Sequence, residues 1–339
     1  EGDLGLNDRN KRSSPVQVGS ASGWNGLIGS DSTIGATKDD GELWIMGKNH
    51  RGQLGQNSLI QYSSPVQIPG TTWDATNIDV NVPAGINMCL KTDGTLWMWG
   101  SNGEGQLGDN SGVSKSSPVQ VLGTNWSSAF THNHGGGAVK TDGTLWMWGN
   151  NYKGNLGQNN TTNYSSPIQV PGTTWKKGCG MGYGVGAVKT DGTLWSWGYD
   201  YQGALGQDQR VTLSSPTQIG SGTDWNTVSN SFIGGQAIKT DGTLWSWGYN
   251  QMGQLGQNSV GYFSSPVQIP GTTWSINRKG SGVGAAMAIK TDGTLWTWGR
   301  NDNGAGGVNN TTQYSSPVQV PGTTWEVVMS NQASAGLKA

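Results

Sequence analysis

The chain has 339 residues, including 57 glycines and 18 tryptophans, and its formal net charge is −1. Charged residues make up only 12% of it, so we expect no basic surface for nucleic acid or anionic membrane. No apolar run has membrane-spanning length, no signal-peptide pattern opens the sequence, and two cysteines in non-equivalent places, Cys89 and Cys179, exclude a disulfide framework. A single, internally repeated domain fits this composition best.

The first repeated element is the marker Ser-Ser-Pro-(Val/Ile/Thr)-Gln-(Val/Ile). It occurs seven times, with its proline at Pro15, Pro65, Pro118, Pro167, Pro216, Pro266 and Pro317. Consecutive prolines are 49 to 53 residues apart, by subtraction of these positions. Because proline cannot donate a ladder hydrogen bond, it is best tolerated at the edge of a sheet. We therefore expect the marker to form the outer strand of each repeat.

A spacer that ends in tryptophan follows each marker, and a hairpin phrase comes next. The phrase Lys-Thr-Asp-Gly-Thr-Leu-Trp-x-Trp-Gly spans residues 91–100, 140–149, 189–198, 239–248 and 290–299, with a looser copy at 38–47. Asp-Gly between apolar runs predicts a two-residue turn in which both residues tolerate positive φ. Period-two alternation puts the two tryptophans on one face and the leucine on the other. Both faces are apolar, so we expect both to be buried.

Four short strands in a repeat of about 50 residues describe one blade of a β-propeller. Seven markers therefore predict an all-β, seven-bladed propeller made of residues 1–339 as a single domain. The sequence stops at Ala339, just before a hairpin strand would follow, and starts at Glu1, just after one. We expect both termini to lie in one blade, which has three strands or borrows the fourth. The chain is also expected to be part of a longer or processed one.

The phrase Trp-x-Trp-Gly-x-Asn-x-x-Gly-Gln-Leu-Gly at this period resembles the regulator of chromosome condensation repeat family. The resemblance covers essentially the whole chain and implies a seven-bladed propeller. Two departures stand out. The family commonly carries a histidine five residues before the hairpin lysine, where this chain has Thr33, Ile86, Gly135, Gly184, Gly234, Ala285 and Ala333. The last turn, residues 304–307, also lacks the leucine.

The repeated polar and aromatic residues are interpreted as structural. The aspartates Asp93, Asp142, Asp191, Asp241 and Asp292 could form a ring of carboxylates, but tight-turn chemistry accounts for all of them. The strict repetition of the tryptophans at strand positions favours core packing over carbohydrate stacking.

Candidate binding residues lie where the repeats differ, in loops held by a rigid scaffold. The first variable stretch follows the spacer tryptophan and contributes Thr131, His132, Asn133, His134, Tyr183, Phe232, Arg278 and Lys279. The second follows Trp-Gly and contributes Tyr152, Tyr201 and Tyr249. An equally weighted alternative is that these are freely varying surface loops. His132 and His134 could bind a metal from one strand face, but no third ligand is near in sequence.

The sequence predicts no metal, no cofactor and no catalytic residues, because no set of nucleophile, base and orienting group is present. Our leading interpretation is a non-enzymatic structural or display propeller that binds a protein or glycan partner, or neighbouring subunits. Similarity to bacterial surface and virus-particle propellers implies an extracellular, cell-surface or virus-particle location. The alternatives are an inhibitor that plugs an enzyme cleft and a regulatory module similar to a nucleotide-exchange factor. The close spacing of the markers leaves no room for the wedge-like insertion that the latter implies.

Overall fold

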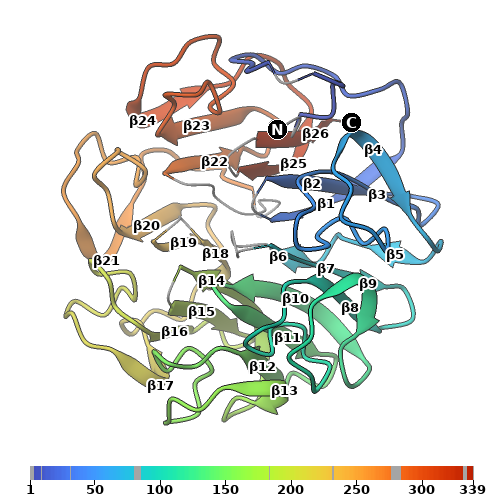
Figure 1. Cartoon of the computed structure of the whole chain (residues 1–339). Coiled ribbons are helices and arrows are strands. Elements are labelled where there is room, and N and C mark those ends of the chain that lie inside the picture. The colour runs from blue at the N-terminus through green and yellow to red at the C-terminus, as the bar shows by residue number, and fades with distance from the viewer. Residues whose placement is uncertain are drawn as a thin grey trace.

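The computed structural model describes residues 4–8, 10–30, 32–79, 85–182, 184–230, 233–275, 284–330 and 334–338. The strands within these residues form seven sheets, arranged as a ring in Figure 1. Six sheets have three to five strands and the seventh has two. The described residues contain no helix, and so none that could cross a membrane. The all-β propeller predicted from the repeats is confirmed.

We number the sheets as blades 1 to 7 in chain order. Blade 1 contains β1 (Trp24–Ser30), β2 (Thr33–Lys38), β3 (Leu43–Gly47) and β4 (Tyr62–Ile68). Blade 2 contains β5 (Trp73–Asp74), β7 (Ile86–Lys91), β8 (Leu96–Gly100) and β9 (Lys115–Gln120). Blade 3 contains β10 (Trp126–His132), β11 (Gly135–Lys140), β12 (Leu145–Gly149) and β13 (Tyr164–Gln169), and β6 (Ile78–Asp79) pairs parallel to β10.

Blade 4 contains β14 (Trp175–Met181), β15 (Gly184–Lys189), β16 (Leu194–Gly198) and β17 (Leu213–Gln218). Blade 5 contains β18 (Trp225–Asn230), β19 (Gly234–Lys239), β20 (Leu244–Gly248) and β21 (Phe263–Gln268). Blade 6 contains β22 (Ala285–Ile289), β23 (Leu295–Gly299) and β24 (Tyr314–Gln319). Blade 7 contains β25 (Trp325–Ser330) and β26 (Ser334–Lys338). The Ser-Ser-Pro marker lies in the outer strand of blades 1 to 6, as predicted.

The hairpin turn differs from the prediction in one respect. In blade 2 the Gly94 N–H donates to the Lys91 carbonyl, and the Lys91 N–H donates to the Thr95 carbonyl. Gly94 has a φ of 76°, whereas Asp93 is not among the residues with positive φ. The turn is therefore a type I turn followed by a left-handed glycine. Asp93 is selected for its side chain, whose Oδ1 accepts hydrogen bonds from the Thr95 N–H (2.9 Å) and hydroxyl (2.6 Å).

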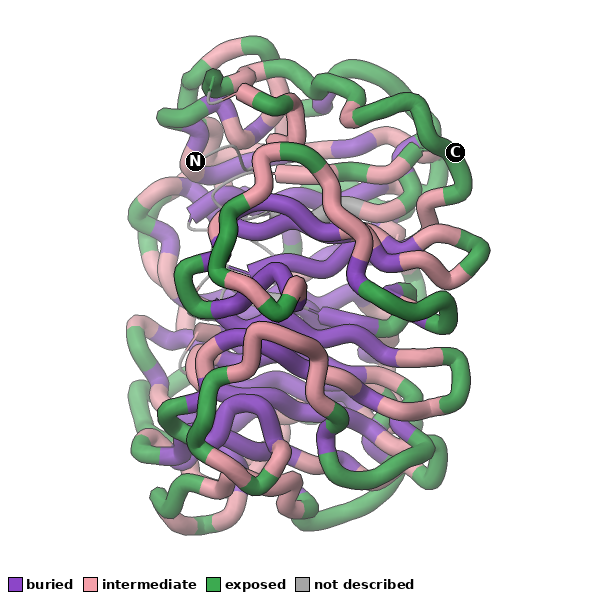
Figure 2. The backbone as a smooth tube through the Cα atoms, turned by 45° about the vertical axis from the view of Figure 1, so that its right-hand side comes forward, coloured by how far each residue is buried: buried purple, intermediate pink, exposed green. Residues whose placement is uncertain are grey.

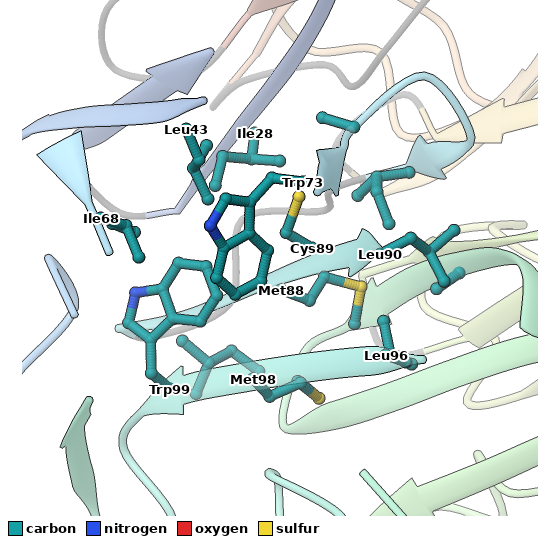
Figure 3. Packing of buried hydrophobic residues seen from close by; sticks show 14 of the residues in the cluster. Ile28, Leu43, Ile68, Trp73, Met88, Cys89, Leu90, Leu96, Met98 and Trp99 are labelled. Atoms are coloured by element: carbon teal, nitrogen blue, oxygen red, sulfur yellow. The ribbon is translucent and has the colours of Figure 1, made fainter. Parts of the chain in front are cut away.

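Tryptophans fill the space between neighbouring blades, as Figure 3 shows for blades 1 and 2. Trp99, the second tryptophan of its hairpin, is fully buried, and its ring centroid lies 6.2 Å from that of Trp73. Its indole Nε1 donates a 2.6 Å hydrogen bond to the carbonyl of Gln53 in the preceding blade. The first tryptophan of the pair, Trp97, is only half-buried. The second tryptophan therefore fixes one blade against the next.

Each hairpin lysine in blades 2 to 6 lies between two tryptophan rings, a contact that the sequence analysis did not predict. In blade 2 the Lys91 Nζ is 4.6 Å from the Trp73 centroid and 4.5 Å from the Trp97 centroid. Such cation–π contacts hold an ammonium against the negative faces of both rings. The lysine therefore joins the spacer tryptophan to the hairpin tryptophan at the Asp-Gly end of the blade.

One hydrogen bond, repeated at every seam, closes the ring. In each case a backbone N–H in the loop of one blade, or for Asn7 in the segment before the first marker, donates to the carbonyl of the first serine in the marker of the next blade. The seven pairs are Asn7 to Ser63, Asn57 to Ser116, Asn110 to Ser165, Asn159 to Ser214, Asp208 to Ser264, Asn258 to Ser315 and Asn309 to Ser13. The last pair joins blade 6 to the N-terminal marker. The ring therefore has seven seams, and Figure 2 shows the buried strands that they enclose.

The first and last described segments, residues 4–18 and the strands β25 and β26, lie in the same part of the ring, where both line one cleft, consistent with the expectation that they share a blade. Lys11 Nζ donates to Asn303 Oδ1 (2.8 Å), and the Ser14 hydroxyl contacts Asn309 Oδ1 at 3.0 Å. The N-terminal marker thus takes the outer position of blade 7. It forms no strand there, and blade 7 has two strands rather than the expected three. The reason is that the marker pairs with a third strand in every other blade, and the described residues of blade 7 have none.

Candidate functional site

The two variable stretches meet at one end of the ring. In blade 3, β11 and β12 pair with Gly135 opposite Gly149, so the turn before β11 and the loop after β12 lie side by side. The Asn150 N–H donates to the His134 carbonyl at 3.0 Å, and Tyr249 makes the same contact to Ile233 in blade 5. We call this end the loop face. The Asp-Gly turns lie at the opposite end of the strands.

The first stretch is less exposed than expected. Thr131 and His132 are fully buried in β10, so neither can contact a partner at the surface of this structure. The His132 Nε2 lies 3.2 Å from the Trp148 carbonyl. Burial lowers the pKa of His132 to about 4, because the charged imidazolium is disfavoured away from water. His132 therefore contributes a neutral imidazole to the core.

Asn133 and His134 follow β10 and are half-buried on the loop face. His134 Nδ1 lies 3.1 Å from Glu104 Oε2 of the neighbouring loop. Tyr183, Phe232, Arg278 and Lys279 lie outside the described residues. The binding role of this stretch stays a prediction.

The two histidines do not share a ligand position. The Nε2 of His132 lies against the Trp148 carbonyl, whereas His134 pairs with Glu104. Among the described residues, no group of three or more histidine, cysteine, aspartate or glutamate side chains could hold a metal ion.

The second stretch has a fixed residue between two variable ones. In blade 2 the fixed residue is Asn102, whose Oδ1 accepts a 2.9 Å hydrogen bond from the Leu107 N–H and whose amide donates to carbonyls across the loop. Asn49, Asn151, Asp200, Asn250 and Asn301 accept the same hydrogen bond in blades 1, 3, 4, 5 and 6. The flanking residues are not needed for this turn and are free to carry function.

Those flanking positions hold tyrosines in three consecutive blades, and the structure brings the tyrosines together. Successive ring centroids are 6.3 Å apart for Tyr199 and Tyr201, 6.4 Å for Tyr201 and Tyr249, and 5.7 Å for Tyr249 and Tyr262. At the other end, Lys153 Nζ lies 4.7 Å from the Tyr199 centroid and 5.4 Å from that of Tyr152. We call these residues the tyrosine row: Tyr152, Lys153, Tyr199, Tyr201, Tyr249 and Tyr262.

The row combines exposed rings with a fixed geometry. Tyr152 is 47% exposed and Tyr201 is 38% exposed, whereas the other three tyrosines are half-buried. Gln251 orders one end, because its Oε1 accepts from the Tyr249 hydroxyl (2.5 Å) and its Nε2 donates to the Tyr262 hydroxyl (2.7 Å). Burial, and then the neighbouring tyrosines, raise the pKa of Tyr249, so its hydroxyl stays protonated at neutral pH.

Asp200 gives blade 4 a different loop centre. It replaces the asparagine found in the other five loops. Its side chain is buried, and its neighbours in the sequence are Tyr199 and Tyr201. Burial raises the pKa of its carboxyl, opposed by the hydrogen bond from the Leu205 N–H. The site therefore offers aromatic faces, hydroxyls and one lysine, with no acid–base pair in contact with them among the described residues.

The sequence identified Tyr152, Tyr201 and Tyr249 of this row but treated them separately from the first stretch. It missed Tyr262, which lies at the far end of the loop that begins with Tyr249. A usable signal was present: each of these loops returns to the outer strand, so its first and last residues lie close together. The sequence contains no information on how rings from different blades stack.

Two kinds of comparison place the chain among known proteins. The regulator of chromosome condensation (RCC1) repeat model matches residues 40–78, 93–137, 142–181, 241–276 and 292–336, which together cover more than half of the chain. The Ultraviolet-B receptor UVR8 of Arabidopsis thaliana is 31% identical over 132 residues, or 35% of this chain. The chain spans only 28% of that relative's length in this match.

Solved structures share the fold at low sequence identity. Human WBSCR16 superposes with a TM-score of 0.81 at 20% identity, over 97% of this chain and 90% of that one. Prp20p of Saccharomyces cerevisiae superposes with a TM-score of 0.75 at 16% identity, over 92% of this chain and 82% of that one. Together with the repeat match, these likenesses show that the chain belongs to the regulator of chromosome condensation (RCC1) repeat family of β-propellers.

Proposed function

We propose that the chain is a non-enzymatic binding propeller that recognises a protein partner through the loop face, with the tyrosine row as its centre. The observation that carries this proposal is the continuous series of ring contacts from Tyr199 to Tyr262 across blades 4 and 5, extended into blade 3 by Lys153. The equivalent loop positions of blades 1, 2 and 6 hold no tyrosine. The tyrosine row is therefore confined to part of the ring, whereas the strands of the blades are nearly the same throughout.

Tyrosine suits recognition for physical reasons. Its ring buries a large apolar area at the cost of only two side-chain torsions, and its hydroxyl can hydrogen-bond at the rim. Rings that already pack against one another lose still less freedom on binding, which favours affinity. Tyrosine, tryptophan and arginine are the residues most enriched at binding hot spots. The row therefore provides a preorganised contact surface.

A protein partner agrees best with the charge and the family. With a formal net charge of −1, the chain has no net positive charge to attract nucleic acid. Prp20p of Saccharomyces cerevisiae, which shares this fold, binds Gsp1p and histones, and this supports a protein partner here as well. We extend the proposal to a location outside a cell or on a virus particle, on the basis of the low charge and the polar, Asn- and Thr-rich loops.

The test compares a loop-face variant with a variant of the opposite face. The immobilised chain is screened against a displayed library of protein domains and, in parallel, against a glycan array. Ligands from either screen are then measured against Tyr152→Ala/Tyr201→Ala/Tyr249→Ala. We expect domain ligands to lose affinity by roughly a hundredfold or more, since each hot-spot ring contributes on the order of 1–2 kcal/mol.

The matched control is Leu122→Ser, which changes an exposed apolar residue outside the loop face. It should leave the same ligands bound with unchanged affinity. Circular dichroism and melting temperature should show that both variants keep the fold. Ligands that bind the triple variant as tightly as the parent would refute the proposal. Selection of glycans alone would replace the protein partner by a carbohydrate.

A further inference from the structure

A cavity of about 290 Å³ lies beside the seam between blades 1 and 2. Residues 55–57 of the blade 1 loop form one side of it, and the outer strand of blade 2 contributes Pro118. The rings of Trp73 and Trp97 belong to its apolar lining, and Lys91 is the one charged residue among those that line it. Every lining residue lies between positions 55 and 118 of the sequence. The cavity is therefore a feature of two closed blades.

The indole N–H groups in this lining already have acceptors. The Trp73 Nε1 donates to a backbone carbonyl at 3.2 Å, and the Trp97 Nε1 donates to the Thr95 hydroxyl at 2.9 Å. Lys91, in contrast, is half-buried between the two rings and forms no hydrogen bond or ion pair with any described residue. Asp93 attracts its ammonium only from beyond ion-pair distance. The three N–H donors of the ammonium are therefore the ones that remain for a ligand.

Blade 1 shows how this arrangement holds a carboxylate. The Lys38 Nζ donates to Glu42 Oε2 at 2.8 Å, and the Trp44 Nε1 donates to the same oxygen at 3.0 Å. The Lys38 Nζ keeps its contact with two tryptophan rings, at 5.6 Å from each centroid. In the hairpin phrase of blade 2, the position of Glu42 is taken by Thr95. An ammonium held between two indoles can thus bind a carboxylate without losing the rings.

Blade 5 supplies a carboxylate to the same lysine from a different position. The Lys239 Nζ lies 3.1 Å from Asp224 Oδ2 and remains 4.9 and 4.8 Å from the centroids of its two tryptophans. Asp224 precedes the spacer tryptophan, where blade 2 has Thr72. Neither Asp224 nor Thr72 has positive φ, unlike the equivalent residues of blades 3, 4 and 6, which are Asn125, Thr174 and Thr273. Blade 2 therefore shares the backbone of blade 5 but has threonine at both positions that could carry a carboxylate.

We propose that the blade 2 cavity binds a small carboxylic acid whose body is about the size of a six-membered ring. Its carboxylate accepts hydrogen bonds from the Lys91 ammonium, as the Glu42 carboxylate does from Lys38. Its ring lies against the apolar lining formed by Trp97 and Pro118. The volume is near the lower end for small-molecule sites, which suits one ring. The charge-assisted hydrogen bond gives selectivity for an acid, and burial of the ring adds affinity.

The probes are cyclohexanecarboxylate and, as its neutral match, cyclohexanecarboxamide. Binding is followed by NMR at the indole N–H signal of Trp97, which is identified by its absence in Trp97→Phe, so that the readout reports this cavity alone. The carboxylate should shift the signal in a saturable way. The amide should bind at least about tenfold more weakly, because it cannot form the charge-assisted bond to the ammonium. A salt concentration of about 0.5 M should weaken binding of the carboxylate by screening the charges.

A second carboxylate distinguishes two sources of the ligand. Methyl glucuronide carries the same acid group on a sugar ring, whose hydroxyls can hydrogen-bond to the polar lining residues Gln56 and Ser117. Tighter binding of cyclohexanecarboxylate would identify the ligand as an apolar acid. Tighter binding of methyl glucuronide would identify it as a sugar acid.

Two chain variants block the site with carboxylates that the chain itself uses elsewhere. Thr95→Glu places the acid of blade 1 in blade 2, and Thr72→Asp places the acid of blade 5 there. Each should occupy Lys91 and weaken the binding of cyclohexanecarboxylate by roughly tenfold or more. Blades 1 and 5 already contain these residues, so both variants should fold. The matched control is Thr161→Asp, which adds the same charge to an exposed loop of blade 3 and should leave the affinity unchanged.

The proposal makes outcomes that can overturn it. No saturable shift of the Trp97 signal with either carboxylate would show that Lys91 only holds the two rings together. Equal affinity for the acid and the amide would also overturn it, as would parental affinity in both Thr95→Glu and Thr72→Asp. The variant Tyr152→Ala/Tyr201→Ala/Tyr249→Ala should bind cyclohexanecarboxylate like the parent, since the cavity shares no residue with the tyrosine row. The site therefore stands or fails independently of the proposed function.

Discussion

Blades 4 and 7 are built from the same repeat and differ in one strand. In blade 4, β15 is held between β14 and β16, and its residues are buried up to Lys189. In blade 7, β26 has β25 on one side and the cleft on the other, and none of its residues is fully buried. The third strand of a blade therefore buries the second strand beside it, whatever the local sequence of the second strand. The four predictions that follow use this contrast.

The largest effect is expected for the spacer tryptophan. Trp175 is 2% exposed and contacts Trp195 and Trp197, with centroids 6.1 and 5.9 Å away. Trp175→Ala should lower the free energy of unfolding by about 3–5 kcal/mol. Its counterpart Trp325 is 7% exposed and has no such pair of rings among the described residues. Trp325→Ala should cost at least about 1 kcal/mol less, since each aromatic pair adds roughly 0.5–1.5 kcal/mol. Guanidinium unfolding of both variants measures the difference, and equal losses would contradict the contrast.

Because His132 lies in a closed blade, its imidazole should stay neutral at pH values well below the pKa of an exposed histidine. In the folded chain its pKa is about 4, against 6.5 for an exposed histidine. Between these values the unfolded chain binds one more proton, so the free energy of unfolding falls as the pH is lowered from 6.5 to 4. The loss should be about 3 kcal/mol.

Denaturant unfolding at pH 7 and pH 4 checks the pH prediction. The variant His132→Gln should lose less stability between the two conditions than the parent does. The same slope in His132→Gln as in the parent would show that another group is responsible.

The lysine contacts give a smaller, matched effect. Lys189 lies over two rings and Lys338 over one. Replacement of each by methionine keeps the length of the side chain and removes the charge. We expect Lys189→Met to destabilise the chain by about 0.5–1 kcal/mol more than Lys338→Met. Guanidinium unfolding of the two variants measures the difference, and equal losses would argue against a contribution from the second ring.

The smallest effect concerns the Asp-Gly turns, which only the closed blades possess within the described residues. The hydrogen bond from the Thr193 hydroxyl, and then that from its N–H, hold the pKa of Asp191 below the ordinary 3.8. Its stabilising contribution is present above pH 3.8 and is lost as the pH falls through the lower, folded value. Asp191→Asn should reduce the slope of melting temperature against pH below pH 4. An unchanged acid slope would argue against this role.

The architecture could be predicted from the sequence because every repeat carries the same local pattern. Alternation, the edge proline and the period of about 50 residues fix the strands, the sheet edge and the blade unit. The position of the termini in blade 7 followed from counting. The turn type was wrong, because Asp-Gly is compatible with more than one left-handed glycine turn and its side-chain bond to Thr95 decides between them.

The site was predicted less well, for a different reason. Loop identity can be read from variation between repeats, but burial cannot: His132 follows the pattern of an exposed loop and lies inside the strand β10. The tyrosine row depends on contacts between residues about 50 positions apart, such as Tyr201 and Tyr249. Such contacts are set by the angle between blades, which no single repeat encodes.

The seam hydrogen bond has a consequence for how such a chain can arise. Asn258 donates to Ser315 as Asn309 donates to Ser13, so each repeat carries the same donor at one end and the same acceptor at the other. A unit with two such complementary ends can be duplicated in a gene without inventing an interface, because the copy already fits its parent. Duplication then needs only to end when the ring of blades is closed. The near-identical repeats of this chain agree with such duplication, and the repeats differ from one another mainly in their loops.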